Sequence, residues 1–319
     1  MTAPQGAPQL DVVIVNWNAY DLVANCIAAL DKLAPTLPPM NVIVVDNAST
    51  SGSPESLGAA NFPLQIIHNS ENVGFAVACN QGAAAGRASR ILFLNPDVVV
   101  TSGEAMRAPL KFLDQEGNAS AGICGVQLRD EKGNISTTLS PFPTPLRAFG
   151  WMTALDRIAP KLFLPHFFPV SAHLETRPVD SVMGAFLVIR RALFERLDGF
   201  STRFFLYYED VDLCRRARNA GYLTWYLSDV SVIHEGCGTT RNIRARRYFY
   251  STRSRIIYGL RHFSPVGAYV TALGWMVIDP AVRLLYAVVT ASPRALVETV
   301  QGTGMLWADS VKFLREKRA

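Results

Sequence analysis

The sequence predicts an α/β fold in which a mostly parallel central sheet is flanked by helices and followed by a basic, apolar helical extension. Runs of β-branched residues alternate with segments of helical apolar spacing over the first hundred residues, a pattern typical of a parallel sheet covered on both faces. Residues 240–319 carry 13 Lys and Arg against 4 Asp and Glu, although the net charge of all 319 residues is only +5. With 49% apolar and 18% charged residues, the chain is folded rather than disordered.

The elements of the first half follow from these runs. Strands are expected at Val12–Trp17, Asn41–Asp46, Leu64–Asn69 and Ile91–Asn95, and helices at Asp21–Asp31 and Gly74–Arg87. Residues 1–9 are expected to be a flexible N-terminus without a signal peptide. The five cysteines form no CxxC pair, which is typical of a protein from a reducing cytoplasm.

Polar side chains finish the four expected strands. They are Asn16, Asn18, Asp46, Asn47, Asn69 and Asp97. Ligands of open α/β sheets bind beyond the carboxyl ends of the strands, so these residues are expected to line one polar crevice. Asn and Asp also end strands simply as turn formers, and this alternative stays open for each residue taken alone.

A series of motifs resembles one known family. They are VVIVNWN, VIVVDNASTSGS, NVGFAVACNQG, ILFLNPDVVV, then MGAFLVIRR, FFLYYEDVDLCRRARNAGY and VSVIHEGCGTT, in order over Asp11–Thr240. Together they resemble the inverting family-two glycosyltransferases with the GT-A fold, and most closely their rhamnosyltransferase branch. The resemblance implies a catalytic domain at 10–240, with a nucleotide-binding half at 10–100 and an acceptor half at 101–240. No GxxxxGK[ST] and no GxGxxG after the first strand is present, which disfavours phosphate-loop NTPases and dinucleotide binders.

The resemblance places a divalent cation at Asn95-Pro96-Asp97, where family members carry a DxD-type motif. Mg²⁺ or Mn²⁺ held by the Asp97 carboxylate would neutralise the charge of a nucleotide diphosphate. Asn95 replaces the first carboxylate and can offer only an amide oxygen or contact sugar or ribose hydroxyls. His234, at the end of another apolar strand, matches a metal-ligating position of the family.

The resemblance also assigns the donor site. Asp46 would accept a hydrogen bond from the N3–H group of uracil or thymine, a donor that cytosine lacks, so UDP- and dTDP-sugars are the expected donors. Asn16, Asn18, Asn47, Asn72, Gly74 and Asn80 are expected to line the same pocket; helix-entry packing is an equally good account of Asn72, Gly74 and Asn80.

Catalysis is expected at the start of the helix that follows FFLYY. By resemblance Asp210 is the general base and Glu209 orients the acceptor, and an apolar aromatic surrounding would raise the pKa of such a carboxylate. Asp212 is expected to cap the helix or pair with Arg215 or Arg216. Met183, Gly184 and Tyr208 are expected on the acceptor side.

The resemblance favours dTDP-L-rhamnose as donor, with a UDP-galactofuranose or UDP-hexose donor as the alternative. The aromatic-rich segment Ser140–Val170, beside a membrane-seeking extension, favours a lipid-linked saccharide of the cell envelope as acceptor. A sugar-1-phosphate nucleotidyltransferase is less favoured, because NWNAYDLV contains no Gly-rich activating loop. A non-enzymatic membrane scaffold would explain the basic extension but not Asp46, Asp97, Asp210 and His234 together.

The extension at 241–319 is expected to associate with a membrane surface rather than with nucleic acid. Arg241, Arg244, Arg246, Arg247, Arg253 and Arg255 precede the apolar run Ser264–Ser292, a combination suited to anionic lipid. Asp279, Pro280 and Arg283 interrupt that run, and a charge at the bilayer centre costs about 2.5 to 3.5 kcal/mol. We therefore expect two short helices lying in the interface, on the inner face of the plasma membrane. The alternative is a helical pair that packs on the domain or on another copy of the chain.

The segment Ser140–Val170 contains six prolines among exposed-looking aromatic residues. We expect it to lack regular structure and to meet a lipid carrier; the alternative is a cover for the acceptor site or a dimer contact.

Overall fold

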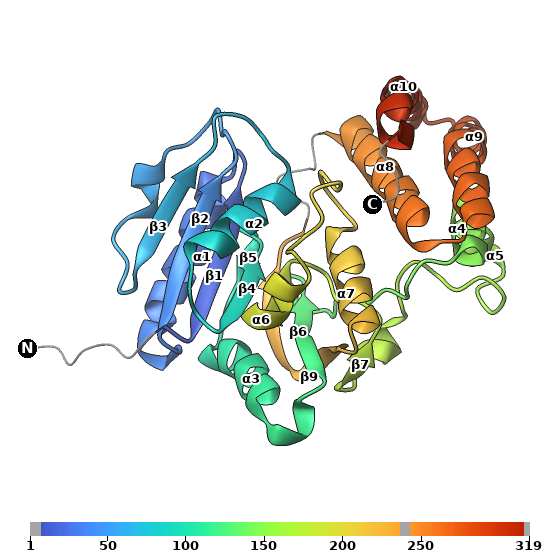
Figure 1. Ribbon diagram of the computed structural model, residues 1–319. Coiled ribbons are helices and arrows are strands. Elements are labelled where there is room, and N and C mark those ends of the chain that lie inside the picture. The colour runs from blue at the N-terminus through green and yellow to red at the C-terminus, as the bar shows by residue number, and fades with distance from the viewer. Residues whose placement is uncertain (1–7, 237–242, 316–319) are drawn as a thin grey trace, which may run out of the picture. The chain divides into compact units, whose positions relative to one another are not determined.

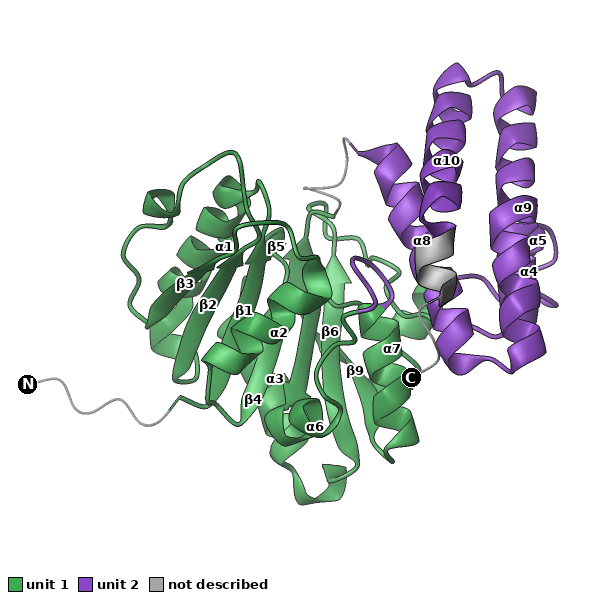
Figure 2. Cartoon of the chain, turned by 45° about the horizontal axis from the view of Figure 1, so that its top comes forward, with its two compact units in different colours: residues 1–141, 167–202, 209–239 green, residues 142–166, 203–208, 240–319 purple. Residues whose placement is uncertain are grey.

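The computed structural model describes residues 8–236 and 243–315 and divides into two compact units (Figures 1 and 2). The first unit comprises residues 1–141, 167–202 and 209–239, and the second comprises residues 142–166, 203–208 and 240–319. The second unit therefore includes two internal segments of the chain in addition to the C-terminal extension. Cys237 and Arg241 lie outside the described residues.

The first unit is built on a nine-stranded sheet. Its strands are β1 (Leu10–Asn16), β2 (Met40–Asp46), β3 (Leu64–His68), β4 (Arg90–Leu94), β5 (Val98–Val99), β6 (Ala121–Arg129), β7 (Arg177–Val179), β8 (Phe186–Arg190) and β9 (Leu223–His234). Their order is β3-β2-β1-β4-β8-β6-β9-β5, with β7 paired to β9. The strands β1 to β4 are parallel, as expected, whereas β8 runs antiparallel to both β4 and β6. The sheet is thus mixed in its second half.

Helices cover both faces of this sheet. They are α1 (Tyr20–Leu33), α2 (Phe75–Ala85), α3 (Gly103–Asp114), α6 (Arg191–Arg196) and α7 (Glu209–Asn219), with 3₁₀ turns at Ala34–Thr36, Pro54–Leu57, Glu116–Asn118 and Val170–His173. Val12 and Ile14 belong to one buried cluster with side chains of α1 and α3. Val13 faces the other side, where a Cβ added to Gly82 of α2 would lie 2.4 Å from its Cγ1. Gly82 therefore permits a close approach of helix and sheet.

The parallel strands bring their carboxyl ends to one edge. In the β1–β2 ladder Asn16 is the partner of Asp46, and in the β2–β3 ladder Asp46 is the partner of His68. The end of β4 leads directly into the Asn95-Pro96-Asp97 turn. The expected convergence of polar strand ends is thus present for β1, β2 and β3.

The second unit is helical. It contains α4 (Pro145–Met152), α5 (Leu155–Ile158), α8 (Arg244–His262), α9 (Pro265–Val289) and α10 (Pro293–Arg315), in which α8, α9 and α10 pack on one another and α4 packs on α9 (Figure 2). The expectation that Ser140–Val170 lacks regular structure was wrong. Thr144 Oγ1 accepts a hydrogen bond from the backbone N–H of Arg147, and Pro145 occupies the first helical position, where its missing N–H costs nothing.

The expectation of two short helices at Ser264–Ser292 was also wrong, because α9 is one continuous helix of 25 residues. Pro280 cannot donate to the carbonyl of Met276, but Trp307 Nε1 of α10 donates to that oxygen at 3.0 Å. Asp279 is buried and accepts hydrogen bonds from Tyr248 Oη and Arg283 Nε, each at 2.9 Å. Contacts within the unit thus compensate both the proline and the charge.

We expect Trp307→Phe to lower the free energy of unfolding by about 1 kcal/mol, because the Met276 carbonyl loses its replacement donor. Urea unfolding of the full chain followed by circular dichroism measures the loss. Val300→Ala is the control, since Val300 is an exposed residue of the same helix. An equal loss in both variants would contradict this account of the continuous helix.

Candidate active site

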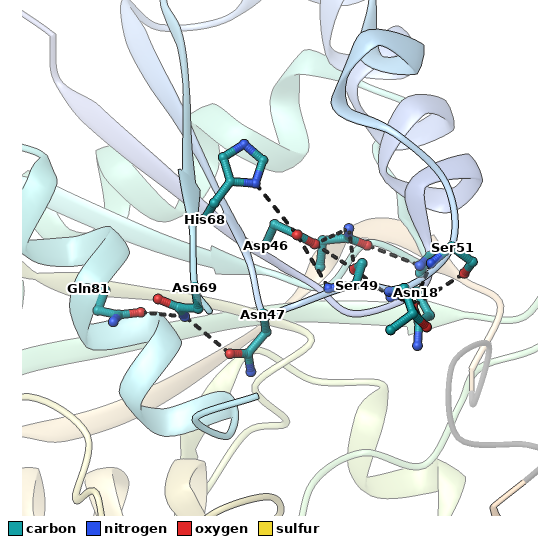
Figure 3. A network of polar contacts seen from close by, with 11 residues as sticks. Asn18, Asp46, Asn47, Ser49, Ser51, His68, Asn69 and Gln81 are labelled. Atoms are coloured by element: carbon teal, nitrogen blue, oxygen red, sulfur yellow. Dashed lines mark hydrogen bonds and ion pairs between the residues drawn. The ribbon is translucent and has the colours of Figure 1, made fainter. Parts of the chain in front are cut away.

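Asp46, at the end of β2, is the centre of a polar network (Figure 3). Its Oδ1 accepts hydrogen bonds from Asn16 Nδ2 at 2.9 Å and from Ser49 Oγ at 2.5 Å. The contacts of Oδ2 are longer, 3.4 Å to the Ser49 backbone nitrogen and 3.6 Å to His68 Nδ1. Oδ1 is therefore committed to the protein, and Oδ2, with only these longer contacts, is able to accept a hydrogen bond from a ligand.

Asn18 shapes the loop that follows β2. Its φ of 54° lies in the left-handed region, which Asn tolerates better than most residues. The side-chain Oδ1 accepts hydrogen bonds from the backbone nitrogens of Thr50 at 2.7 Å and Ser51 at 3.2 Å. Asn18 thus holds the loop that carries Ser49 beside Asp46.

Asn47 connects the same strand end to the start of α2. Its Nδ2 donates to Asn72 Oδ1 at 2.9 Å, and its Oδ1 accepts from the Val73 backbone nitrogen at 3.0 Å. Asn72 Oδ1 also accepts from the backbone nitrogen of Gly74, which precedes α2 with a φ of 87°. Asn47, Asn72 and Gly74 are thus brought together, and they fix how α2 begins.

Asn80 lies in a different contact. Its Nδ2 donates to the backbone oxygen of Phe200 at 2.8 Å, and its Oδ1 accepts from the backbone nitrogen of Phe200 at 2.9 Å. Both ends of the side-chain amide therefore bind the backbone of one residue from far along the chain. This gives Asn80 a structural role, and its place in the donor pocket stays a prediction.

The Asn95-Pro96-Asp97 turn places Asp97 beside His234. The turn is closed by a hydrogen bond from the Val98 backbone nitrogen to the Asn95 oxygen, and Val98 of β5 pairs with His234 of β9. Asp97 Oδ1 lies 3.4 Å from His234 Nε2, and both side chains are about nine-tenths buried. No cluster of three or more His, Cys, Asp or Glu side chains is found in the described part of the chain. Asp97 and His234 could nevertheless hold Mg²⁺ or Mn²⁺, because such ions at phosphate sites take their remaining ligands from water and substrate.

Glu209 and Asp210 begin α7. Burial raises the pKa of Glu209 well above its usual value, and the charges of Asp210 and Asp212 add to this rise. Glu209 Oε2 is buried with no hydrogen-bond partner among the described residues. Burial also raises the pKa of Asp210, against the opposing effect of hydrogen bonds from the backbone nitrogens of Gly184 and Val211, each 2.8 Å long. The pair thus combines proton affinity with a fixed orientation of Asp210.

Gly184 and Ala185 connect this pair to the Asn95-Pro96-Asp97 turn. The Gly184 backbone nitrogen donates to Asp210 Oδ2, and the Ala185 oxygen accepts from the Asn95 backbone nitrogen at 2.9 Å. Two consecutive residues therefore hold the turn on one side and Asp210 on the other. Met183 precedes them and is half-buried.

Tyr207 and Tyr208, which precede Glu209, both have a φ of 69°. Left-handed conformations are costly for bulky residues and concentrate at functional sites. Tyr208 belongs to the second unit and Glu209 to the first. Asp212 forms the expected ion pair with Arg216, with Oδ2 and Nε 2.7 Å apart.

Sequence reasoning missed Ser49 and His68. Ser49 lies in the motif VIVVDNASTSGS and His68 in the expected strand Leu64–Asn69. The register of parallel strands could have indicated His68, because it stands level with Asp46 at the same edge of the sheet.

A family model described as glycosyl transferase family 2 matches residues 11–198. This is more than half of the chain, and the chain belongs to the family-two glycosyltransferases. The predicted family and the predicted GT-A type of fold are thereby confirmed. The protein is a glycosyltransferase rather than a nucleotidyltransferase or a non-enzymatic scaffold.

Two curated relatives indicate the branch. The chain is 28% identical over 244 residues to the N-acetylglucosaminyl-diphospho-decaprenol L-rhamnosyltransferase of Mycobacterium tuberculosis, covering 72% of this chain and 77% of that protein. It is 26% identical over 171 residues to rhamnosyltransferase WbbL of Escherichia coli, covering 53% and 60%. The chain therefore resembles the rhamnosyltransferase-like branch, as predicted.

Solved structures share the fold. Mannosyltransferase PcManGT from Pyrobaculum calidifontis, in complex with GDP-Man and Mn²⁺, superposes with a TM-score of 0.54 at 17% identity, covering 99% of this chain and 89% of that chain. S. aureus TarS 1–349 gives a TM-score of 0.52 at 13% identity, covering 95% and 91%. At these identities the similarity concerns the fold alone.

Proposed function

We propose that the protein transfers L-rhamnose from dTDP-L-rhamnose to a hydroxyl of a lipid-linked saccharide, with inversion at the anomeric carbon. The observation that carries the chemistry is the backbone connection through Gly184 and Ala185, which holds Asp210 and the Asn95-Pro96-Asp97 turn at one place. The choice of rhamnose and of a lipid-linked acceptor rests on the two rhamnosyltransferase relatives. A UDP-galactofuranose or UDP-hexose donor is the alternative, because Asp46 would read uracil and thymine alike.

The proposed reaction is a single displacement. The Asp210 carboxylate takes the proton of the acceptor hydroxyl as the hydroxyl oxygen forms a bond to the anomeric carbon. The bond from that carbon to the diphosphate breaks on the opposite side, and its electron pair leaves with the nucleotide. Hydrogen bonds from Gly184 and Val211 keep the Asp210 carboxylate oriented throughout, and Glu209 orients the acceptor.

Asp97 and His234 would hold the divalent cation, whose charge compensates that of the diphosphate when it is bound. Asn95 would contact the donor from the same turn. Asp46 would bind the base, while Asn16, Asn18, Asn47, Asn72 and Gly74 keep the surrounding loops in place. A transfer assay with purified protein, dTDP-L-rhamnose, Mn²⁺ and a polyprenyl diphosphate-linked saccharide tests the proposal. The rhamnosylated lipid is the expected product, and its absence with every uracil or thymine donor would contradict it.

We also propose that the second unit binds the inner face of the plasma membrane. Among the described helices, α9 is the one that is long and apolar enough to cross a bilayer. In its first half, from Val266 to Val277, exposed large residues recur every three or four positions along one side, while Trp275 and Asp279 are buried on the other side. The exposed apolar residues of α9 are Val266, Tyr269, Val270, Leu273, Val277, Ile278, Leu285, Tyr286, Val288 and Val289. One apolar face and one packed face favour a helix lying in the interface, and the Arg-rich α8 suits anionic lipid.

We expect Leu273→Glu to weaken binding to phosphatidylglycerol vesicles by about tenfold or more, because a carboxylate would enter the apolar face. Co-sedimentation measures the binding. Leu174→Glu is the matched control, since Leu174 is 60% exposed and Leu273 is 64% exposed, but Leu174 belongs to the first unit. Equal binding of Leu273→Glu and the unaltered protein would contradict the membrane proposal.

A further inference from the structure

His68 belongs to the polar network of Figure 3 and lies beside Asp46. Its side chain is open to solvent. His68 ends β3, which is the first strand in the order of the sheet. Its side chain is 54% exposed, whereas that of Asp46 is only 9% exposed. The imidazole and the carboxylate face each other in the close-up view, with Nδ1 3.6 Å from Oδ2 (Figure 3).

The 3.6 Å separation is longer than a hydrogen bond. No hydrogen bond of the His68 ring to another residue is found in the described chain. The ring is therefore not needed to complete the network, in contrast to Ser49, whose hydroxyl accepts from Asn16 and Asn18 and donates to Asp46. A polar ring that is close to the network but uncommitted can bind a ligand.

Asp46 Oδ2 is the oxygen that a base would reach, because Oδ1 already accepts hydrogen bonds from Asn16 and Ser49. His68 flanks this same oxygen. A nucleobase whose N–H donates to Oδ2 would consequently place the group next to that N–H beside the His68 imidazole. In uracil and thymine both neighbours of the N3–H group are carbonyl oxygens, which accept a hydrogen bond from an imidazole N–H.

We infer that His68 is a base-recognition residue that binds the carbonyl beside the N3–H group and so selects uracil or thymine nucleotides. The inference rests on the proposed donor site at Asp46 and goes further by naming the group that reads the second position of the base. Guanine binds a carboxylate best when two of its N–H groups donate, one to each carboxylate oxygen. Asp46 Oδ1 already accepts hydrogen bonds from Asn16 and Ser49. Cytosine lacks the N3 proton, so Asp46 gains nothing from it.

Titration calorimetry with dTDP, UDP, GDP and CDP at one Mn²⁺ concentration tests this role. In His68→Ala we expect the affinities for dTDP and UDP to fall by about tenfold, the size of one hydrogen bond, while those for GDP and CDP stay unchanged. His68→Asn places a side-chain amide N–H near the position of Nδ1 and should restore part of the loss. Gln65→Ala is the control, because Gln65 is exposed on the same strand. This variant should bind all four nucleotides like the unaltered protein.

Two results would overturn the inference while leaving the proposed function intact: an equal loss for all four nucleotides in His68→Ala, or no loss for any of them. If the unaltered protein bound none of the four, the donor site at Asp46 would be wrong, and the role of His68 with it. The inference is supported if His68→Ala binds dTDP and UDP more weakly but GDP and CDP as before, and if Gln65→Ala binds all four nucleotides like the unaltered protein.

Discussion

Replacing Asp210 by Asn is expected to reduce the rate of sugar transfer by about 10²- to 10⁴-fold, the usual contribution of a general base. Asn cannot take the acceptor proton, but it has nearly the same size and can still accept a hydrogen bond from Gly184 or Val211. Donor affinity should therefore stay within about twofold of the unaltered protein, since the substitution keeps the size of a side chain that acts on the acceptor rather than on the donor. Initial rates of nucleotide release, with calorimetry of donor binding, measure the two effects separately.

The pH dependence of the unaltered enzyme follows from the same residue. Burial raises the pKa of Asp210, and the base works only when deprotonated. Activity should therefore be lost as the pH falls through this raised pKa, at a higher pH than an ordinary aspartate would give. The profile of kcat/KM against pH locates this limb, and Asp210→Asn should not show it.

Asp114→Asn is the matched control for Asp210→Asn. Asp114 is 62% exposed and makes a surface ion pair with Arg90, which is expected to contribute little. Rates for this variant should equal those of the unaltered protein. Transfer by Asp210→Asn at more than about a tenth of the normal rate would contradict the assignment of the base.

Removing the Asp97 carboxylate is expected to abolish the gain in donor affinity that a divalent cation provides. In the unaltered protein, Mn²⁺ should strengthen dTDP-L-rhamnose binding by at least about tenfold, or about 1.4 kcal/mol. In Asp97→Ala the affinities with Mn²⁺ and with a chelator should be equal, because His234 alone is left of the pair. Calorimetry under both conditions provides the comparison without requiring catalysis.

His234→Ala should lose most of the same increment, since its Nε2 lies 3.4 Å from Asp97 Oδ1. The affinity measured in chelator should not change in either variant, which separates metal binding from a general disturbance of the site. If Asp97→Ala kept the full Mn²⁺ effect, the Asn95-Pro96-Asp97 stretch would be a structural turn.

The sequence predicted the strands and helices of residues 10–100 well because buried parallel strands have a strong local pattern. Expected and observed ends of β2 coincide at Asp46, and the polar residues after β1 and β2 meet as the parallel arrangement requires. The reversed direction of β8 could not be read in this way. A buried strand has the same apolar residues whichever way it runs, and its direction depends on connections between distant segments.

The helical unit was predicted least well, because distant contacts decide its structure. A proline such as Pro280 normally predicts that a helix ends there. In the structure Trp307, 27 positions later, donates to the carbonyl that the proline leaves without a hydrogen bond. Likewise, Asp279 looks costly in an apolar run until Tyr248 and Arg283 are seen to bind it. In the site, the left-handed backbone of Tyr207 and Tyr208 could not be predicted from the sequence, because Gly or Asn is the usual residue in that conformation.

The anomeric configuration of the product tests the central claim most directly. The protein would be incubated with dTDP-L-rhamnose, Mn²⁺ and a lipid-linked saccharide, and the new glycosidic linkage would be assigned by NMR from its one-bond carbon–proton coupling. A single displacement with Asp210 as base predicts a rhamnosyl linkage whose configuration is opposite to that of the donor. A linkage with retained configuration would require a second displacement and would contradict the mechanism proposed for this site.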